Sequence, residues 1–158
     1  MLSRAVELGQ ARFGLTDKHT MIAAANLGSV WIQTGKIDQA KKLHLDVLEN
    51  CKKTLGENHI TTMYAGSRAA QTLLKADEPE RALETIQPVF EQFYALRGET
   101  HHDTITVRRV LARIYRALNQ SEAARDQLEH AVKAAESDPK QFSQLAQQIR
   151  SELQQLNK

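Results

Sequence analysis

A 42-residue period is the feature of this sequence that most constrains its fold. Gly14, Gly56 and Gly98 are separated by this step. The step also relates three further sets of positions: Thr20, Thr62 and Thr104; Gly28, Ala70 and Ala112; and Ala40, Ala82 and Ala124. Self-similarity at a period of about 20–50 residues is the signature of a repeat architecture, in which each repeat is one supersecondary unit. The sequence therefore predicts an array of similar units.

Each repeat has the composition and punctuation of a helical hairpin. Among 158 residues only seven are glycine and three are proline, while helix formers such as Ala, Leu, Gln, Glu and Lys are abundant. A threonine at the start of each first helix is expected to act as its N-terminal cap. We expect seven to eight helices and no strand. The first helices are expected at residues 20–34, 62–76 and 104–118, and the second helices at 37–54, 79–97 and 121–137.

Stacking of the hairpins is expected because no single hairpin can bury its apolar face alone. The small residues Gly28, Ala70 and Ala112 should be buried where the two helices of a hairpin approach each other. Residues 1–13 carry only the second-helix register, so Leu2, Ala5, Val6 and Leu8 should be partly exposed or covered by a second copy. The chain then divides into a truncated repeat at 1–13, full repeats at 14–55, 56–97 and 98–137, and a C-terminal capping helix at 138–158.

Two local patterns carry a resemblance to a known family. The first helices contain Leu27-Gly28-x-x-Trp31 and its counterparts, and two linkers read Gly56-x-x-His59-x-x-Thr62 and Gly98-x-x-His101-x-x-Thr104. This pattern resembles the tetratricopeptide repeat (TPR), and the long period with this linker resembles the kinesin light chain type. The resemblance implies an all-α fold, a right-handed α-α superhelix (TPR solenoid) of stacked antiparallel helical hairpins. Asp17 stands at the histidine position of the first linker.

The sequence contains no pattern of catalytic or metal-binding residues. His59 and His101 occupy equivalent linker positions, and we interpret them as packing against or capping the next helix rather than binding a metal. The single cysteine, Cys51, excludes an internal disulfide framework and is expected to be reduced and buried. A Gly-rich phosphate loop and a nucleophile elbow are both missing from the sequence. We therefore expect no enzyme activity, no cofactor and no metal.

Composition also bears on location and on partner class. No segment approaches the roughly 18 apolar residues that span a membrane, and the N-terminus has no apolar secretory core. A net charge of +2 is too small to indicate nucleic acid, and aromatic residues suited to base stacking are scarce on the face of the first helices that carries the arginines. We therefore expect a cytoplasmic protein that contacts neither membrane nor nucleic acid.

The resemblance implies that the first helices line the inner, concave surface of the array. Arg109, Arg113 and Arg116 are spaced four and three residues apart, so they form one stripe on a helix. Guanidinium groups bind carboxylates in bidentate fashion, which predicts a groove for an acidic peptide. In the alternative interpretation these arginines pair with Glu or Asp from neighbouring helices. The partner-binding residues expected on this surface are Asn26, Arg68, Gln71, Lys75, Arg109, Arg113 and Arg116.

These observations favour a non-catalytic protein-interaction module or scaffold that binds a peptide or partner segment on its concave face. The alternative function is a peptide-sensing regulatory domain of a larger signalling enzyme or transcription regulator. The carboxylate clamp of chaperone-binding relatives is not expected, because Ala25 and Ser29 stand at its Lys and Asn positions. Self-association through the N-terminal edge is a further expectation. The helix after Pro88 concentrates Phe90, Phe93 and Tyr94, which are expected either to pack against the next hairpin or to form a second candidate surface.

Overall fold

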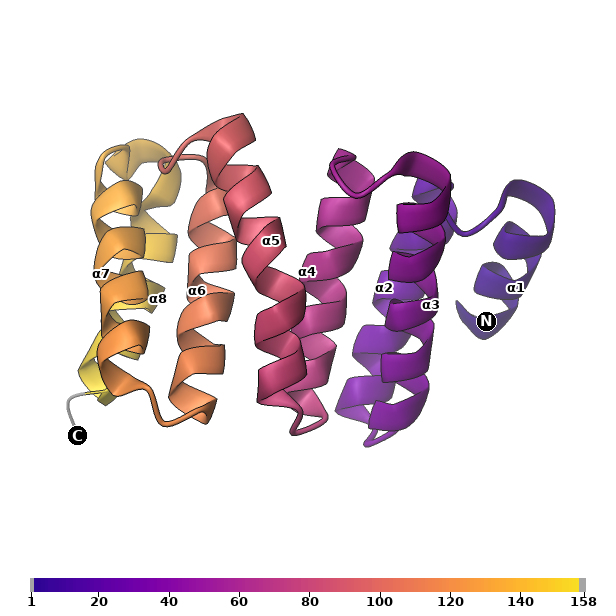
Figure 1. Ribbon diagram of the computed structural model, residues 1–158, viewed down its shortest axis with the longest axis horizontal. Coiled ribbons are helices and arrows are strands. Elements are labelled where there is room, and N and C mark those ends of the chain that lie inside the picture. The colour runs from indigo at the N-terminus through magenta and orange to yellow at the C-terminus, as the bar shows by residue number, and fades with distance from the viewer. Residues whose placement is uncertain (1, 157–158) are drawn as a thin grey trace. The chain divides into compact units, whose positions relative to one another are not determined.

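The computed structural model describes residues 2–156, without the side chains of Leu2, Ser3 and Ala5. Over this range the chain forms eight α-helices and no strand, as expected (Figure 1). The expected exposure of Leu2 and Ala5 lies outside the described side chains. The helices are α1 (Leu2–Phe13), α2 (Lys18–Gln33), α3 (Ile37–Leu55), α4 (Ile60–Lys75), α5 (Pro79–Arg97), α6 (His102–Ala117), α7 (Ser121–Glu136) and α8 (Pro139–Leu156).

The helices group into two compact units, which are described separately. Unit 1 ends at Glu78 and unit 2 begins at Pro79, so the boundary falls within the second predicted repeat. In unit 1, α1 packs on α2, α2 on α3 and α3 on α4. In unit 2, α5 packs on α6, α6 on α7 and α7 on α8. Figure 1 shows these sequence neighbours lying antiparallel within each unit.

The turns inside the hairpins use left-handed backbone geometry. Gly35, Asp77 and Asn119 have φ values of 76°, 60° and 59°. Glycine adopts this region without strain, and Asp and Asn tolerate it better than other residues. These residues therefore let the chain turn sharply from the end of each first helix into the second helix. Within the second hairpin, α5 continues through Pro88 without interruption, and Pro88 lies on its exposed side.

The capping role predicted for the threonines is wrong. The first helices begin two residues before Thr20, Thr62 and Thr104, and each N-cap lies three residues before its threonine. Asp17 caps α2, where its carboxylate accepts hydrogen bonds from the backbone N–H groups of His19 and Thr20 at 3.0 Å. An acceptor at the linker's fourth residue therefore satisfies the free amides at the helix start.

Histidine takes the same capping position in the other two linkers. Nδ1 of His59 accepts from the Thr61 backbone N–H at 3.2 Å, and Nδ1 of His101 accepts from the Asp103 backbone N–H at 3.2 Å. The expectation that these histidines cap the next helix is confirmed. Asp17 replaces histidine in the first linker without loss of the cap, because the interaction requires only an acceptor.

The three threonines are buried and anchor the helix starts. The Thr62 hydroxyl donates to the backbone carbonyl of Gly56 at 2.7 Å, across the linker. The Thr104 hydroxyl donates to the carbonyl of Phe93 in α5 at 3.4 Å. Thr20 donates to the Asp17 carboxylate at 3.2 Å. The repeated threonine therefore ties the helix start to the segment before it, rather than satisfying the first helical amides.

The small residues of the 42-residue register are buried, as predicted. Gly28 is buried, Ala70 is 0% exposed and Ala112 is 2% exposed. Gly28 has a specific reason to lack a side chain: a Cβ there would lie 2.3 Å from ring atoms of His44 in α3. In the 42-residue register, His44 stands where the other repeats have Ile86 and Leu128. The first hairpin therefore combines a smaller residue on α2 with a polar ring on α3.

His44 is the main buried polar residue of the first hairpin. Its Nδ1 lies 2.7 Å from the Thr72 hydroxyl, and that hydroxyl donates to the Arg68 carbonyl at 3.0 Å. Its Nε2 is buried without a hydrogen-bond partner among the described residues. Burial, followed by the positive charge of Arg68, lowers the pKa of His44 despite the opposing effect of the Ala24 carbonyl. The ring is therefore neutral at pH 7.

Substitutions at Gly28 and His44 should be coupled. Gly28→Ala should destabilise the fold by roughly 1–3 kcal/mol, because the added methyl displaces the His44 ring. The double variant Gly28→Ala/His44→Leu should recover most of this loss, since it recreates the Ala112 and Leu128 pair of the third hairpin. Urea unfolding of both variants measures the coupling. Equal stabilities for wild type and Gly28→Ala would contradict the packing described.

Neutral burial of His44 should make stability depend on pH. Because its folded-state pKa lies below the ordinary value of 6.5, the unfolded chain takes up a proton first as pH falls. Stability should therefore be fully present above about pH 6.5 and decrease below it. The Gly28→Ala/His44→Leu variant should show a smaller decrease in urea unfolding between about pH 7 and pH 5. The same decrease in both chains would assign the effect to other groups.

Candidate functional site

The predicted binding residues of unit 1 lie on α2 and α4. Asn26 of α2 and Arg68 and Lys75 of α4 are exposed. Gln71 is half-buried, and its Nε2 donates to the Ser67 hydroxyl at 3.3 Å. Since Arg68, Gln71 and Lys75 are three and four residues apart, they share one face of α4. This face therefore presents two cations and one amide.

The predicted residues of unit 2 form what we call the α6 arginine stripe: Arg109, Arg113 and Arg116. Nη2 of Arg109 lies 2.7 Å from Oε1 of Glu152 in α8. Nη2 of Arg113 lies 2.5 Å from the same oxygen. Arg116 is exposed and has no ion pair among the described residues. The alternative interpretation, pairing with a carboxylate of a neighbouring helix, thus applies to Arg109 and Arg113 but not to Arg116.

Glu152 lies between the two arginines with incomplete hydrogen bonding. Its side chain is 18% exposed, and that of Arg109 is 14% exposed. Burial of the carboxyl raises its pKa, but hydrogen bonds from Arg113 and Arg109 outweigh burial and hold the pKa below its ordinary value. Oε2 of Glu152 and Nε of Arg109 are buried without partners among the described residues. The Glu152 carboxylate is therefore ionised, but one of its oxygens and one nitrogen of Arg109 lack a hydrogen bond.

Sequence reasoning missed Glu152, although the register contains the signal. Steps of 42 residues lead from Asn26 to Arg68, Val110 and Glu152. Glu152 therefore holds on α8 the same register position that Asn26 and Arg68 hold on first helices. Buried Phe142, Ala146 and Ile149 fix α8 against its unit, and Glu152, three residues after Ile149, lies at the edge of this buried face within reach of α6. Extending the repeat by one further step would have predicted this position.

Arg108 was also missed, and it is structural. Its residue is 7% exposed, and its guanidinium lies 4.8 Å from the ring centroid of Phe90 and 5.8 Å from that of Tyr94. Nη1 donates to Oε1 of Gln127 in α7 at 3.2 Å. The aromatic side chains after Pro88 are thus used to cover a buried cation. The sequence does contain a signal for this role, because a large cation stands at a position of the register where the other repeats have the small residues Ala24 and Gly66.

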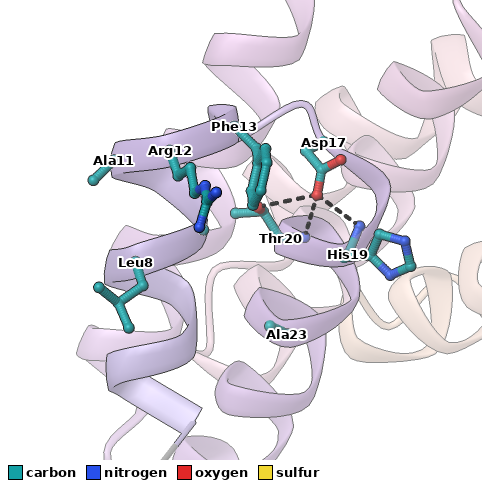
Figure 2. A pocket seen from close by; sticks show the side chains of 9 residues that line it. Leu8, Ala11, Arg12, Phe13, Asp17, His19, Thr20 and Ala23 are labelled. Carbon is teal, nitrogen blue, oxygen red and sulfur yellow. Dashed lines mark hydrogen bonds between the residues drawn. The ribbon is translucent and has the colours of Figure 1, made fainter.

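A groove lies between α1 and α2 at the N-terminal edge of unit 1 (Figure 2). It is an open hollow of about 610 Å³. Leu8 and Phe13 of α1 border it and are 60% and 63% exposed, whereas Val6 is 5% exposed. The prediction that part of this helix is exposed is therefore confirmed for Leu8 and wrong for Val6, which packs into the core.

The floor of this groove depends on a close helix approach. Gly9 of α1 faces Thr20 of α2, where an added Cβ would lie 2.6 Å from the threonine hydroxyl. Figure 2 shows the Asp17 carboxylate bonded to the backbone of His19 and Thr20 at the rim. Hydrogen bonds, chiefly from the Thr20 backbone, lower the pKa of Asp17. Asp17 is thus engaged as a cap, and the groove is mainly apolar.

Other chemistry is sparse in the described part of the chain. No three His, Cys, Asp or Glu side chains within it gather as a possible metal site. Cys51 is buried, and burial raises the pKa of its thiol, so it is unreactive. Within residues 2–156 no helix has both the length and the apolar character that crossing a bilayer requires. The candidate binding surfaces are therefore the face of α4 with Arg68 and Lys75, the α6 arginine stripe and the α1–α2 groove.

Comparisons with known proteins identify the repeat. Models of the tetratricopeptide repeat match residues 20–61 and 62–137, which together exceed half of the chain. Among solved structures, the nearly identical TPR-like repeats of a protein described as a kinesin light chain from Podosopora anserina superpose with a TM-score of 0.77, 20% identity and 86% coverage of this chain. BtubC (BKLC) from P. vanneervenii superposes with a TM-score of 0.70, 20% identity and 99% coverage.

These matches confirm the repeat type and the solenoid fold expected from the sequence. The chain spans 64% and 65% of the lengths of those two structures. At 20% identity the structural likeness establishes the fold alone. No curated protein matches the sequence.

Ionised Glu152 should stabilise the fold in a pH-dependent way. Because its folded-state pKa is lowered, this contribution is present above the ordinary pKa of 4.5 and is lost as pH falls through the folded value. Glu152→Gln should therefore flatten the acid limb of the stability curve. Glu136→Gln, which removes the exposed pair with Arg150, is the matched control. Identical acid limbs for the two variants in urea unfolding would show that the Glu152 pairs contribute nothing.

Self-association through the N-terminal edge stays a prediction. Exposed Phe13 and Leu8 beside an apolar groove should favour association of two copies. We expect the mean mass in sedimentation equilibrium to rise with protein concentration, and Phe13→Ser to reduce this rise. Leu96→Ser, at an equally exposed leucine of α5, is the control. A concentration-independent monomer mass would contradict the prediction.

Proposed function

This chain belongs to the tetratricopeptide repeat family, and from that premise we propose that it binds an acidic segment of a partner protein along its first helices. Repeats of this family generally mediate protein–protein interactions, and such arrays are typically non-catalytic scaffolds. The proposal names two surfaces, one in each unit: the face of α4 with Arg68 and Lys75, and the α6 arginine stripe. Its partner is a peptide segment rich in Asp or Glu.

One observation carries this proposal. Arg109 and Arg113 converge on a single carboxylate oxygen of Glu152, at 2.7 and 2.5 Å. The spacing and rotamers of the stripe thus suit carboxylate binding without rearrangement of the helix backbone. Arg116 continues the same stripe by three residues and has no ion pair within the described range. It supplies an exposed guanidinium for a carboxylate from outside the chain.

The face of α4 supports the same chemistry. Arg68 and Lys75 are exposed cations two turns apart, and Gln71 between them can donate or accept hydrogen bonds. An extended or helical acidic segment therefore finds more than one contact on a first helix. Because most of these cations are exposed, the attraction should be screened over about 8 Å at physiological ionic strength. We propose that the encounter occurs in the cytoplasm.

Charge reversal at Arg116 tests the proposal. A fluorescent peptide of six glutamates should bind the wild-type chain and bind Arg116→Glu at least about tenfold more weakly, because like charges then oppose each other. Fluorescence anisotropy at low salt gives both dissociation constants. Arg116 is preferable to Arg113, whose reversal would also set a glutamate beside Glu152.

Arg125→Glu provides the matched control for this test. Arg125 is an exposed arginine of α7, and its reversal changes the net charge by the same amount. Its affinity for the glutamate peptide should remain within about twofold of wild type, and raised salt should weaken binding in both chains. Equal losses in the two variants would mean that only net charge matters, and the proposed surface would be wrong.

A further inference from the structure

The carboxylate of Glu152 lies where the proposed function needs a partner's carboxylate. Oε1 accepts from Nη2 of both Arg109 and Arg113, and these contacts come from α8, two helices further along the chain than α6. Glu152 also holds the register position of Asn26 and Arg68, which lie on proposed binding faces. An acidic segment approaching the stripe therefore meets two arginines that already hold a carboxylate.

The contact is suited to exchange. Oε2 of Glu152 and Nε of Arg109 are buried without partners among the described residues. A buried polar atom without a hydrogen bond opposes the burial of the group that carries it. Arg113 remains 46% exposed, so one of the two guanidinium groups can be reached from solvent while the pair is formed. The internal carboxylate is thus held less firmly than a fully bonded bidentate pair.

The rest of α8 does not depend on this contact. Its apolar side, with buried Phe142, Ala146 and Ile149, packs into the core of unit 2. Leu153, one residue after Glu152, is only partly buried. A separate ion pair joins Arg150 of α8 to Glu136 of α7 at 2.5 Å. Release of Glu152 would therefore loosen the last turn of the helix and leave its first turns docked.

We propose that Glu152 is an internal occupant of the α6 arginine stripe, and that an acidic segment of a partner protein displaces it in order to bind Arg109 and Arg113. This inference rests on the proposed function. It adds a means of regulating that binding, because α8 of the chain itself competes with the partner for Arg109 and Arg113. A site occupied internally has a lower apparent affinity, by the fraction of time for which it is free.

Removal of the internal carboxylate should therefore strengthen binding. The probe is the fluorescent peptide of six glutamates, with a peptide of six glutamines as reference. Glu152→Gln should bind the glutamate peptide at least about threefold more tightly than Glu136→Gln binds it. Both variants lose one negative charge, so general attraction is matched; Glu152→Gln removes the two ion pairs of that carboxylate, and Glu136→Gln removes the one pair that joins α7 to α8. Circular dichroism checks that both remain helical.

The possible results separate the two proposals. Equal affinities of Glu152→Gln and Glu136→Gln, with binding that still depends on Arg116, would overturn the internal occupant and leave the proposed function standing. If neither wild type nor Glu152→Gln prefers the glutamate peptide to the glutamine peptide, the proposed function itself fails. Tighter binding of the glutamate peptide by Glu152→Gln alone supports both.

Hydrogen exchange on the unaltered chain gives a second readout that needs no variant. A saturating concentration of the glutamate peptide should speed amide exchange over residues 150–156, because the last turn of α8 loses its contact with α6. Exchange over residues 139–146 should not change, since that part stays packed in the core. Unchanged or slower exchange over residues 150–156 in the bound chain would overturn the displacement.

Discussion

The close approach of paired helices at small residues is the constraint on which the rest of the structure depends. Gly28 gives room to the His44 ring in α3, and Ala112 lies in one core with Leu128 and Ala131 of α7. These contacts fix which side of α2 faces α3 and which side of α6 faces α7. The side of each helix that faces away from the core is then left for polar residues, which is why Arg113 and Arg116 of α6 and Arg68 of α4 reach the surface.

The fold could be predicted from the sequence because equivalent positions in successive repeats should have the same burial, so each repeat checks the helix register assigned to the others. Small residues at Gly28 and Ala70 predict that Ala112 is buried as well, and all three positions are buried. The helix starts were harder to predict. Threonine is a good cap in general, but here Thr62 bonds back to the Gly56 carbonyl while His59 provides the cap. Residue preference alone does not distinguish these two roles.

The candidate site could be predicted only in part. Periodicity places Arg109, Arg113 and Arg116 on one stripe, but it does not state which carboxylate lies opposite. Extending the 42-residue register from Val110 leads to Glu152. Arg108 instead breaks the register, because a cation stands where the other repeats have Ala24 and Gly66. Charge partners depend on side-chain reach between helices, which a one-dimensional pattern does not contain. The binding surface therefore remains a prediction, and the pattern alone did not place Glu152 beside Arg109 and Arg113.

The energetics of the stripe also follow from its partial burial. Exposed ion pairs contribute only about 0–1 kcal/mol, because the attraction between the charges is offset by desolvation and ordering. The ion pair of Glu152 with Arg109 is more buried than an exposed surface pair. However, Oε2 of Glu152 and Nε of Arg109 have no hydrogen-bond partner within the described residues. A net stabilisation of this modest size is consistent with an exchange between an internal and an external carboxylate. A fully bonded buried triad would resist such an exchange.

The most direct measurement is a nuclear magnetic resonance titration that follows the arginine side-chain Nε–H signals of the chain as the six-glutamate peptide is added. The account predicts that the signals of Arg109, Arg113 and Arg116 shift together and saturate at one concentration, while that of Arg108, stacked on Phe90, does not move. Saturating shifts confined to Arg12, at the α1–α2 groove, would contradict it and place the binding surface at the N-terminal edge.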